Sequence, residues 1–447
     1  MAGRYKAYPE YKASGVQWLG DIPSDWRVIP LKHLATLNPK KSGINKQKMS
    51  DHCSFVPMDK LKLNSLKLDE TKLISDVYDG YTYFENEDVL MAKVTPCFEN
   101  KNMAVAKNLL NGIGFGSSEI YVLRTNSKLN NQFLFYRLQE DGFMEIATAA
   151  MSGAGGLKRV PAEIINTFLA AFPLYEEQQK IANFLDHETA KIDTLIAKQE
   201  KLIELLKEKR QAVISHAVTK GLNPNALMKD SGVEWLGEVP EHWVIKSYRY
   251  ACKIYRGKFG HRPRNDPAFY DGEYPFIQTG DVARAGKYIK DYKQTLNEKG
   301  IGVSQKFPVG TLMMAIAANI GDTAILGFEA YAPDSVVGFK PKSDIDLEFL
   351  RYSFMAAFPA LEQTSTQSTQ ANLNVDRIGA VQASFPSISE QREIVAYLDT
   401  LLEQYDDIES KSQKSIELMK ERKTALISAA VTGKIDVRVW EPQGVQG

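Results

Sequence analysis

The chain carries one thirteen-residue segment twice, and this repeat constrains the fold more than any other feature of the sequence. Residues 14–26 read SGVQWLGDIPSDW and residues 231–243 read SGVEWLGEVPEHW, so eight of the thirteen positions are identical. Four of the five tryptophans of the chain lie in these segments, as Trp18, Trp26, Trp235 and Trp243. A shared pattern of this length indicates an internal duplication.

A second repeated segment closes each half of the chain. Residues 207–219 read KEKRQAVISHAVT and residues 420–432 read KERKTALISAAVT, again with eight identities in thirteen positions. The offset of this pair is 213 residues (420 − 207), close to the 217 residues (231 − 14) that separate the tryptophan segments. The chain is therefore predicted to contain two copies of one unit, with similar ends and divergent middles.

Each copy is predicted to end in a long helix, over about 176–219 and 389–432. The first stretch contains no proline or glycine, and apolar residues recur in it with heptad spacing. Gly221 and Gly433 follow the two stretches, as is typical of helix C-termini. A helix of this length must bury its apolar stripe, so we expect the two to pair as an antiparallel coiled coil with pseudo-twofold symmetry. Its predicted core comprises Leu185, Ile192, Leu195, Gln199, Leu202, Leu206, Val213, Leu398, Leu401, Tyr405, Ile408, Ser412, Met419 and Leu426.

The divergent middles, roughly 27–172 and 244–385, contain short β-rich runs between turn residues and are typical of mixed α/β domains. The expected fold class is therefore α+β, with two mixed α/β domains and two long helices. The expected division of the chain is a first variable domain (1–175), a central helix (176–225), a second variable domain (226–387) and a distal helix with a tail (388–447).

Composition excludes some classes of protein. The chain has 55 basic and 55 acidic residues, so it is not a strongly basic free-standing nucleic-acid binder, although a local basic patch stays possible. Its three cysteines form no CxxC pair, which argues against a zinc ribbon or a disulfide framework and fits a reduced cytoplasmic setting. The longest apolar run, 312–318, is too short to cross a bilayer.

No segment carries a recognised catalytic motif. The sequence lacks a GxxxxGK[ST] phosphate loop, an Asn/Asp-Pro-Pro-Tyr/Phe methyltransferase motif and an HExxH metal motif. A nuclease-like Glu-x-Lys occurs at 70–72 with Asp59 upstream, but such a tripeptide arises often by chance and is better explained as a solvated charged turn. We therefore expect no catalytic residues and no metal site in this chain.

Two pairs of loops at equivalent places in the repeats are candidates for nucleic-acid contacts. A basic loop follows each tryptophan segment, and clusters of four basic groups suit phosphate contacts. Before each long helix lies a second loop, glycine-rich in the first copy and rich in amides in the second; such amides can read adenine. An ordinary solvated loop is the alternative in each case. The predicted DNA-binding residues are Lys40, Lys41, Lys46, Lys48, Lys158, Arg159, Arg256, Lys258, Arg262, Arg264, Gln367, Gln370 and Asn372.

The combination of SGVxWLGxxPxxW starts, FP…EQxxI…LD helix entries and KExxxALISxAVTG-like helix ends resembles the specificity (S) subunit of type I restriction–modification systems. The resemblance covers nearly the whole chain. It implies two target-recognition domains that each read one half of a bipartite, asymmetric DNA site. It also implies that the helices set the separation of these domains and dock methyltransferase (M) subunits.

The same resemblance implies partners and cofactors. Two methyltransferase subunits and, in the full complex, restriction (R) subunits are expected to bind the chain together with double-stranded DNA. The complex would methylate adenine and cut DNA with ATP, whereas the S subunit would carry no catalytic residues. S-adenosylmethionine, ATP and Mg are accordingly expected in the partner subunits, and no cofactor in this chain.

Two other functions remain open from the sequence. A stand-alone coiled-coil scaffold would explain the helices but not the twin basic loops. A solitary methyltransferase would need the catalytic motif and cofactor loop that the sequence lacks.

Overall fold

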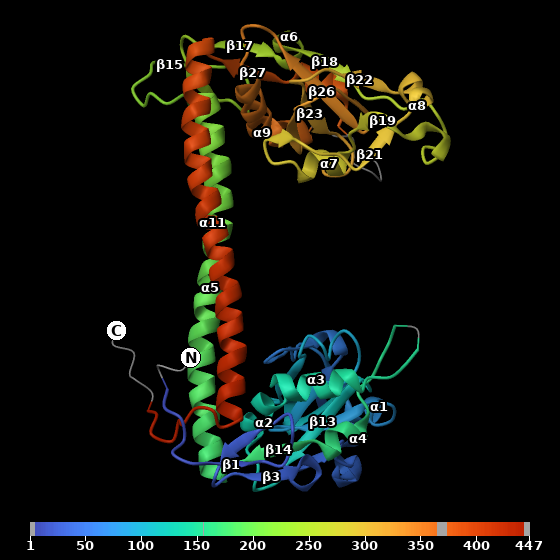
Figure 1. Cartoon of the computed structure of the whole chain (residues 1–447), viewed down its shortest axis with the longest axis vertical. Coiled ribbons are helices and arrows are strands. Elements are labelled where there is room, and N and C mark those ends of the chain that lie inside the picture. The colour runs from blue at the N-terminus through green and yellow to red at the C-terminus, as the bar shows by residue number, and fades with distance from the viewer. Residues whose placement is uncertain (1–4, 155, 364–372, 442–447) are drawn as a thin grey trace. The chain divides into compact units, whose positions relative to one another are not determined.

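The computed structural model of the chain describes residues 5–154, 156–363 and 373–441 (Figure 1). These residues group into two units. The first unit comprises residues 1–199 and 414–447, and the second comprises residues 200–413. Each unit therefore contains one variable domain together with part of each long helix.

The two long helices are α5 (Tyr175–Lys220) and α11 (Ile388–Val431). Gly221 and Gly433 follow them with φ values of +75° and +74°, the left-handed conformation in which a helix commonly ends. The prediction of two long helices is confirmed, because each helix begins and ends within one residue of the expected position.

Two four-stranded sheets form the variable part of the first unit, in the orders β11-β10-β13-β4 and β8-β5-β12-β9. Within the second sheet β5 and β12 are parallel, and all other neighbours in both sheets are antiparallel. Tyr83 and Phe84, neighbours on one strand, belong to different core clusters, as the two-residue repeat of a strand requires. The strands are β4 (Ala35–Leu37), β5 (His52–Val56), β8 (Thr71–Leu73), β9 (Thr82–Glu85), β10 (Val89–Ala92), β11 (Met103–Val105), β12 (Ile113–Gly116) and β13 (Ile120–Thr125).

The variable part of the second unit contains a five-stranded sheet, β18-β26-β23-β24-β20, and a four-stranded sheet, β21-β19-β25-β22. Helix α9 (Leu347–Gln363) packs on the five-stranded sheet, where Phe349 and Phe354 share a core with Met314 of β23. Met313 faces the other core cluster. The strands are β18 (Cys252–Arg256), β19 (Tyr270–Phe276), β20 (Tyr288–Ile289), β21 (Gln294–Leu296), β22 (Gln305–Phe307), β23 (Leu312–Ala315), β24 (Thr323–Leu326), β25 (Ala330–Ala332) and β26 (Val336–Pro341).

Shorter helices complete each unit. In the first unit they are α1 (Ile74–Val77), α2 (Asn131–Arg137), α3 (Asp141–Ala149) and α4 (Ala162–Thr167). In the second unit they are α6 (Tyr248–Ala251), α7 (Thr279–Arg284), α8 (Glu298–Val303) and α10 (Val375–Ala380).

The repeated sequence segments build the same joint in both units. In the first unit β3 (Arg27–Pro30) pairs with β14 (Leu169–Phe172), and in the second β17 (Val244–Ser247) pairs with β27 (Gln382–Phe385), both antiparallel. The indole of buried Trp26 donates to Glu177 at the start of α5 over 2.9 Å. The indole of buried Trp243 donates to Glu390 at the start of α11 over 3.0 Å.

Each joint also receives the end of the other long helix. A Cβ added to Gly433, just after α11, would lie 3.4 Å from the ring of Trp26, and one added to Gly221, just after α5, would lie 3.2 Å from the ring of Trp243. Each tryptophan therefore lies against the start of its own repeat's helix and the end of the other repeat's helix. This arrangement explains why these segments, rather than the middles, remained alike.

The buried face of the helices differs from the predicted core. Leu195 (51% exposed), Leu202 (38%) and Ile408 (39%) were expected inside but lie on the surface. Their places are taken by residues one position later or eight positions later along the chain, Ile196, Ile203 and Ile416, which are buried or half-buried. The remaining predicted core residues, Leu185, Ile192, Gln199, Leu206, Val213, Leu398, Leu401, Tyr405, Ser412, Met419 and Leu426, are buried or half-buried.

Ion pairs between the long helices run in opposite chain directions. In the second unit Arg210 pairs with Asp406, while Lys207, three residues earlier, lies 3.7 Å from Glu409, three residues later. These parts of α5 and α11 are therefore antiparallel. In the first unit Lys423 of α11 donates to Asp193 of α5 over 2.7 Å.

Three further findings concern the residues that the structure describes. None of their helices is long and apolar enough to cross a membrane. They contain no group of three or more histidine, cysteine or acidic side chains placed to hold a metal ion. The thiols of Cys53 and Cys252 are buried, and burial raises the pKa of Cys53 to about 11 and that of Cys252 to about 12.

Candidate nucleic-acid interface

The first basic loop, residues 38–48, presents lysines without acidic partners. Lys40 and Lys48 are exposed. Lys41 is half-buried, because its ammonium donates to the carbonyl oxygen of Tyr78 and lies 4.7 Å from the centre of that ring. Among the described side chains of this loop, none of the three forms an ion pair; the side chain of Lys46 is outside that set. Lys40 and Lys48 are therefore available for phosphate contacts.

The second basic loop, residues 255–264, follows β18 and is largely paired with aspartates. Arg256 pairs with Asp376. Arg262 and Arg264 both approach Asp334, at 3.6 and 2.5 Å. Lys258 is exposed and has no ion pair with any residue in the described ranges. The four basic groups of this loop thus share two carboxylates.

The second pair of predicted loops is only partly described. Lys158 and Arg159 lie on the surface of the first unit, and Arg159 forms two hydrogen bonds of 2.9 Å with the carboxylate of Glu119. The hydrogen bonds from Arg159 lower the pKa of Glu119 below its usual value. Gln367, Gln370 and Asn372 fall within 364–372, outside the described residues.

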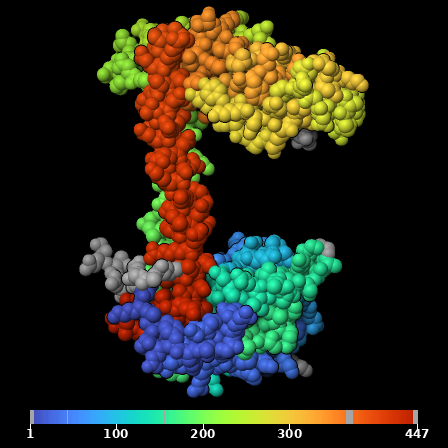
Figure 2. Space-filling model, viewed as in Figure 1, coloured from blue at the N-terminus to red at the C-terminus, as the bar shows by residue number. Residues whose placement is uncertain are grey.

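A polar groove of about 290 Å³ lies beside the second basic loop. Its floor is aromatic, with Phe259 and Phe276 buried and Tyr270 half-buried. The space-filling view shows that the segment around residues 255–305, coloured yellow-green to yellow, forms the part of the second unit remote from α11 (Figure 2). Polar side chains line the rest of the groove, namely Arg264, Asn265, Gln278, Thr279, Gln294 and Ser335.

Most of these groove residues were not predicted from the sequence. Gln278 and Gln294 lie at the ends of two neighbouring strands, β19 and β21, and no motif marks them. A hydrogen bond from the Gln278 amide nitrogen to the Gln294 amide oxygen joins them across these strand ends. Only their adjacency in the sheet, which the sequence does not give, reveals a common surface.

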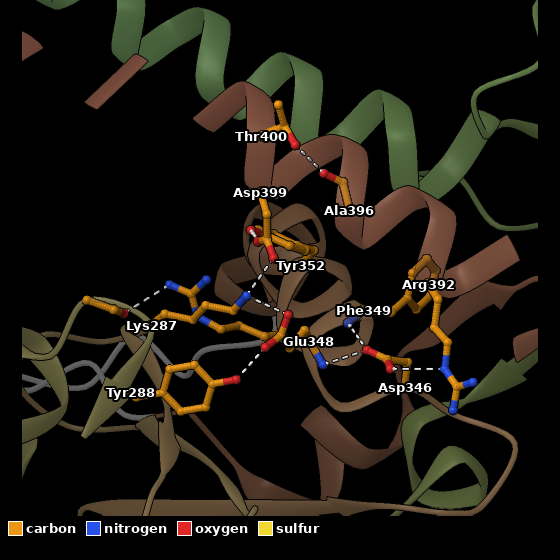
Figure 3. Close-up of polar contacts among 12 residues, drawn as sticks. Lys287, Tyr288, Asp346, Glu348, Phe349, Tyr352, Arg392, Ala396, Asp399 and Thr400 are labelled. Carbon is orange, nitrogen blue, oxygen red and sulfur yellow. Dashed lines mark hydrogen bonds and ion pairs between the residues drawn. The ribbon is translucent and has the colours of Figure 1, made fainter. Parts of the chain in front are cut away.

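A polar cluster attaches the second variable domain to α11 (Figure 3). Tyr352 of α9 donates to Asp399 of α11 over 2.6 Å, and the ammonium of Lys287 donates to the same carboxylate over 2.7 Å. Lys287 also binds Glu348, which accepts a hydrogen bond from Tyr288. Burial alone would lower the pKa of Lys287, but its hydrogen bonds to Asp399 and Glu348 raise it, so the lysine stays charged.

The first unit has the same tyrosine–aspartate contact without the lysine. Tyr136 of α2 donates to Asp186 of α5 over 2.6 Å, and Gln132 donates to this carboxylate over 2.9 Å. Asp186 is the repeat equivalent of Asp399 (399 − 186 = 213). A groove of about 370 Å³ lies beside this contact, and Lys107 lines it.

Apolar side chains are exposed on the long helices at equivalent positions of the repeats. Leu195 and Ile408 are equivalent (408 − 195 = 213), and so are Leu205 and Leu418 (418 − 205 = 213), and all four are exposed. In the second unit exposed Tyr397 lines a groove of about 400 Å³ together with Ala212, His216 and Leu222. Exposed apolar positions that recur in this way indicate a contact surface.

The nuclease-like tripeptide shows no catalytic arrangement. Lys72 of β8 lies 3.5 Å from Glu70 and 3.7 Å from the centre of the Phe55 ring, so its ammonium is occupied by neighbours on the surface. The described part of the chain therefore gives the charged-turn explanation of residues 70–72 and none for bond cleavage.

Comparison with known proteins identifies relatives. A family described as "Type I restriction modification DNA specificity domain" matches residues 23–205 and 240–418. The chain is 34% identical to the EcoEI specificity subunit of Escherichia coli over 164 residues, which are 36% of this chain and 27% of that protein, so the match spans about a quarter of the relative. It is 22% identical to the putative MjaX specificity subunit of Methanocaldococcus jannaschii over 433 residues, 94% of this chain and 96% of that protein.

Solved structures share the fold. A chain from a type I restriction–modification system, solved to explain complex assembly and conformational transition, superposes with a TM-score of 0.75 at 18% identity, covering 93% of this chain and 99% of that one. The HsdS subunit from Thermoanaerobacter tengcongensis gives a TM-score of 0.56 at 17% identity, covering 93% and 98%.

Proposed function

The chain belongs to the type I restriction modification DNA specificity family, which matches it twice, and on this premise we propose that it is the subunit that gives a type I complex its DNA target. The observation that carries the proposal is the presence of two copies of the family domain, each with its own variable sheets and its own surface loops. The subunit itself is non-catalytic, and chemistry belongs to its partners.

Each variable domain reads one half of a bipartite, asymmetric site. The frames of the two domains are alike, as the equivalent tryptophan joints indicate, but their loops carry different side chains. Different loops on one frame are what two different half-sites require, because base edges are read by side chains, whereas phosphate contacts are shared by all sequences.

The long helices form an antiparallel coiled coil with pseudo-twofold symmetry and set the separation of the half-sites. Three ion pairs support this proposal, because their residue numbers have one constant sum (207 + 409, 210 + 406 and 193 + 423 each give 616). A constant sum is the signature of one antiparallel register. A helix of 46 residues is about 69 Å long at 1.5 Å per residue, so one domain alone cannot touch both half-sites.

Methyltransferase subunits dock on the helices, and the exposed leucines support this proposal. Leu195 and Leu418 in the first unit, and Leu205 and Ile408 in the second, give each unit an apolar helix surface. We assign this surface to apolar helices of two methyltransferase subunits, one for each copy of the repeat. Those subunits bind S-adenosylmethionine, and restriction subunits with ATP and Mg complete the nuclease.

Backbone contacts to DNA come from the basic loops. Lys40 and Lys48 are the strongest candidates because they are exposed and have no acidic partner in the described structure. Lys41, Lys46, Lys158, Lys258 and the arginines of the second loop remain predicted contacts. The balanced net charge suits a chain whose partners enclose DNA.

A domain replacement tests the proposed function. The chain is coexpressed with its methyltransferase subunit, and residues 244–385 are replaced by the equivalent domain of a related S subunit. Methylation mapping should show one half of the site changed, with the other half and the spacer length unchanged. Alteration of both halves, with assembly intact, would contradict separate reading by the two domains.

The same preparation separates the two alternatives. A solitary methyltransferase would transfer methyl groups without the coexpressed subunit. A scaffold would leave the methylated sequence unchanged by the replacement.

A further inference from the structure

The groove beside the second basic loop combines an aromatic floor with a rim of hydrogen-bonding side chains. Phe259 and Phe276 are buried beneath it, so the rim is supported by packed side chains. The rim holds a guanidinium (Arg264), side-chain amides (Asn265, Gln278, Gln294) and hydroxyls (Thr279, Ser335). These are the groups that read base edges in DNA.

Arg264 is held at both its backbone and its side chain. Its carbonyl oxygen accepts a hydrogen bond from Tyr270, which belongs to the groove floor. Its guanidinium donates through one Nη atom to Asp334 over 2.5 Å, while the side chain remains 48% exposed. Within the described residues the guanidinium has no other acceptor, so its remaining N–H groups stay available.

Such an arginine is prepared for a bidentate contact. A guanidinium has five N–H donors in a fixed planar arrangement, and a carboxylate on one edge leaves donors for a second acceptor. Guanine offers two acceptors, O6 and N7, at the matching spacing in the major groove. Because Asp334 already restricts the side chain, less conformational entropy is lost when a base binds.

The other arginines of the loop are arranged differently. Arg262 donates to the carbonyl oxygens of Phe259 and His261 over 2.7 and 2.8 Å, so it ties the loop backbone together. Arg256 pairs with Asp376 and does not line the groove. Arg264 is the one arginine of the three that lines the groove.

The two glutamines add a second oriented donor. Gln278 donates its amide nitrogen to the amide oxygen of Gln294, which turns the Gln294 nitrogen outward as a donor. A neighbouring base with a major-groove acceptor would satisfy it. The groove is therefore rich in donors and suits purine acceptors.

We propose that this groove is a base-reading site of the second unit, in which Arg264 contacts the O6 and N7 atoms of a guanine and Asp334 acts as its positioning residue. The inference rests on the proposed function. It adds the residues and the base that sequence analysis did not assign to this half-site.

The test uses the complex of the full chain with its methyltransferase subunits. Methylation rates are measured on a library in which every position of both half-sites is varied, for the wild type, Arg264→Ala, Arg264→Lys, Asp334→Asn and the matched control Arg256→Ala. Arg264→Ala should reduce the preference for guanine at one position of one half-site by roughly 10- to 100-fold. Arg264→Lys should do the same while keeping the charge, because lysine lacks the planar fork.

The other variants identify the roles of the residues. Asp334→Asn should weaken the preference at the same position by a smaller factor, and Arg256→Ala should leave every base preference unchanged. Thermal unfolding and assembly of each variant are measured beside the rates, and Arg264→Lys decides the matter if Arg264→Ala does not assemble.

Two outcomes overturn the inference. One is an unchanged preference at every position in an assembled Arg264 variant, and the other is relaxation at a position that Arg256→Ala relaxes equally. Failure of the proposed function is recognised separately, because the wild-type complex would then methylate no bipartite site at all.

Discussion

The two units share a frame but differ in how they hold their positive charge. In the first unit the exposed lysines of the basic loop have no carboxylate partner in the described structure, whereas in the second unit three arginines share Asp334 and Asp376. An unpaired, flexible lysine provides charge without fixed direction, and an arginine held by a carboxylate provides direction. The difference indicates that duplication preserved the joints and left the surfaces free to diverge.

The largest expected effect tests the shared frame. Trp26→Ala and Trp243→Ala should each lower the free energy of unfolding of their unit by about 3–5 kcal/mol, because each removes a fully buried indole. Urea unfolding of the full chain, followed by circular dichroism, measures both. Trp235→Ala, at a half-buried position, is the control with a smaller loss. Losses at Trp26 and Trp243 that differ by more than about 2 kcal/mol would break the equivalence of the joints.

The helix ends should respond unequally to the same substitution. Gly221→Ala and Gly433→Ala each place a side chain in the left-handed region, which costs about 1–2 kcal/mol. A Cβ on Gly433 would also lie 2.5 Å from the ring of Pro23, whereas a Cβ on Gly221 has 3.2 Å to its nearest neighbour. Thermal unfolding should therefore show the larger loss for Gly433→Ala. Equal losses would mean that Pro23 moves aside freely.

The domain attachments should differ in their dependence on salt. Lys287→Met removes the lysine that joins Glu348 and Asp399, and the expected loss for this partly exposed cluster is about 1 kcal/mol. The loss should shrink in about 1 M salt, where charges are screened within about 3 Å. Lys107→Met, beside the equivalent attachment of the first unit, is the control and should change stability by less than about 0.5 kcal/mol.

The smallest effects concern DNA affinity in the assembled complex. Replacing both Lys40 and Lys48 by alanine should reduce the slope of log K against log salt by about 1.8, or 0.9 for each phosphate contact, and should weaken all sequences alike. Arg256→Ala should reduce the slope by less than about 0.9, because Asp376 already neutralises this side chain. Filter binding at several salt concentrations measures both slopes. An unchanged slope for the lysine variant would place the first loop in solvent.

Sequence reasoning succeeded where the signal was local and repeated. The lengths of α5 and α11 followed from the absence of helix breakers and from Gly221 and Gly433, and the structure confirms them. The coiled-coil seam was less certain because apolar residues stand next to one another, as in Leu195–Ile196. Either member of such a pair satisfies a heptad pattern, and only the packing of the unit selects Ile196.

The surface could be predicted only as a set of charges. The composition of the second basic loop gave its arginines, but Asp334 and Asp376 lie 70 and 120 residues later in the chain. Tertiary contacts of this range decide which arginine remains free to bind a ligand. The amides of Gln278 and Gln294 were missed for the same reason, because the two residues meet only at neighbouring strand ends.

The tryptophan joints have a consequence for a shorter version of the protein. Each joint combines the start of a helix from one repeat with the end of a helix from the other repeat. A chain of one repeat would therefore leave its joint half-filled and would complete it only by exchanging helix ends with a second copy. Such a domain-swapped homodimer would present two identical domains and would select a palindrome. Fusing two repeats into one chain is thus the step that allows the two halves of the target to differ.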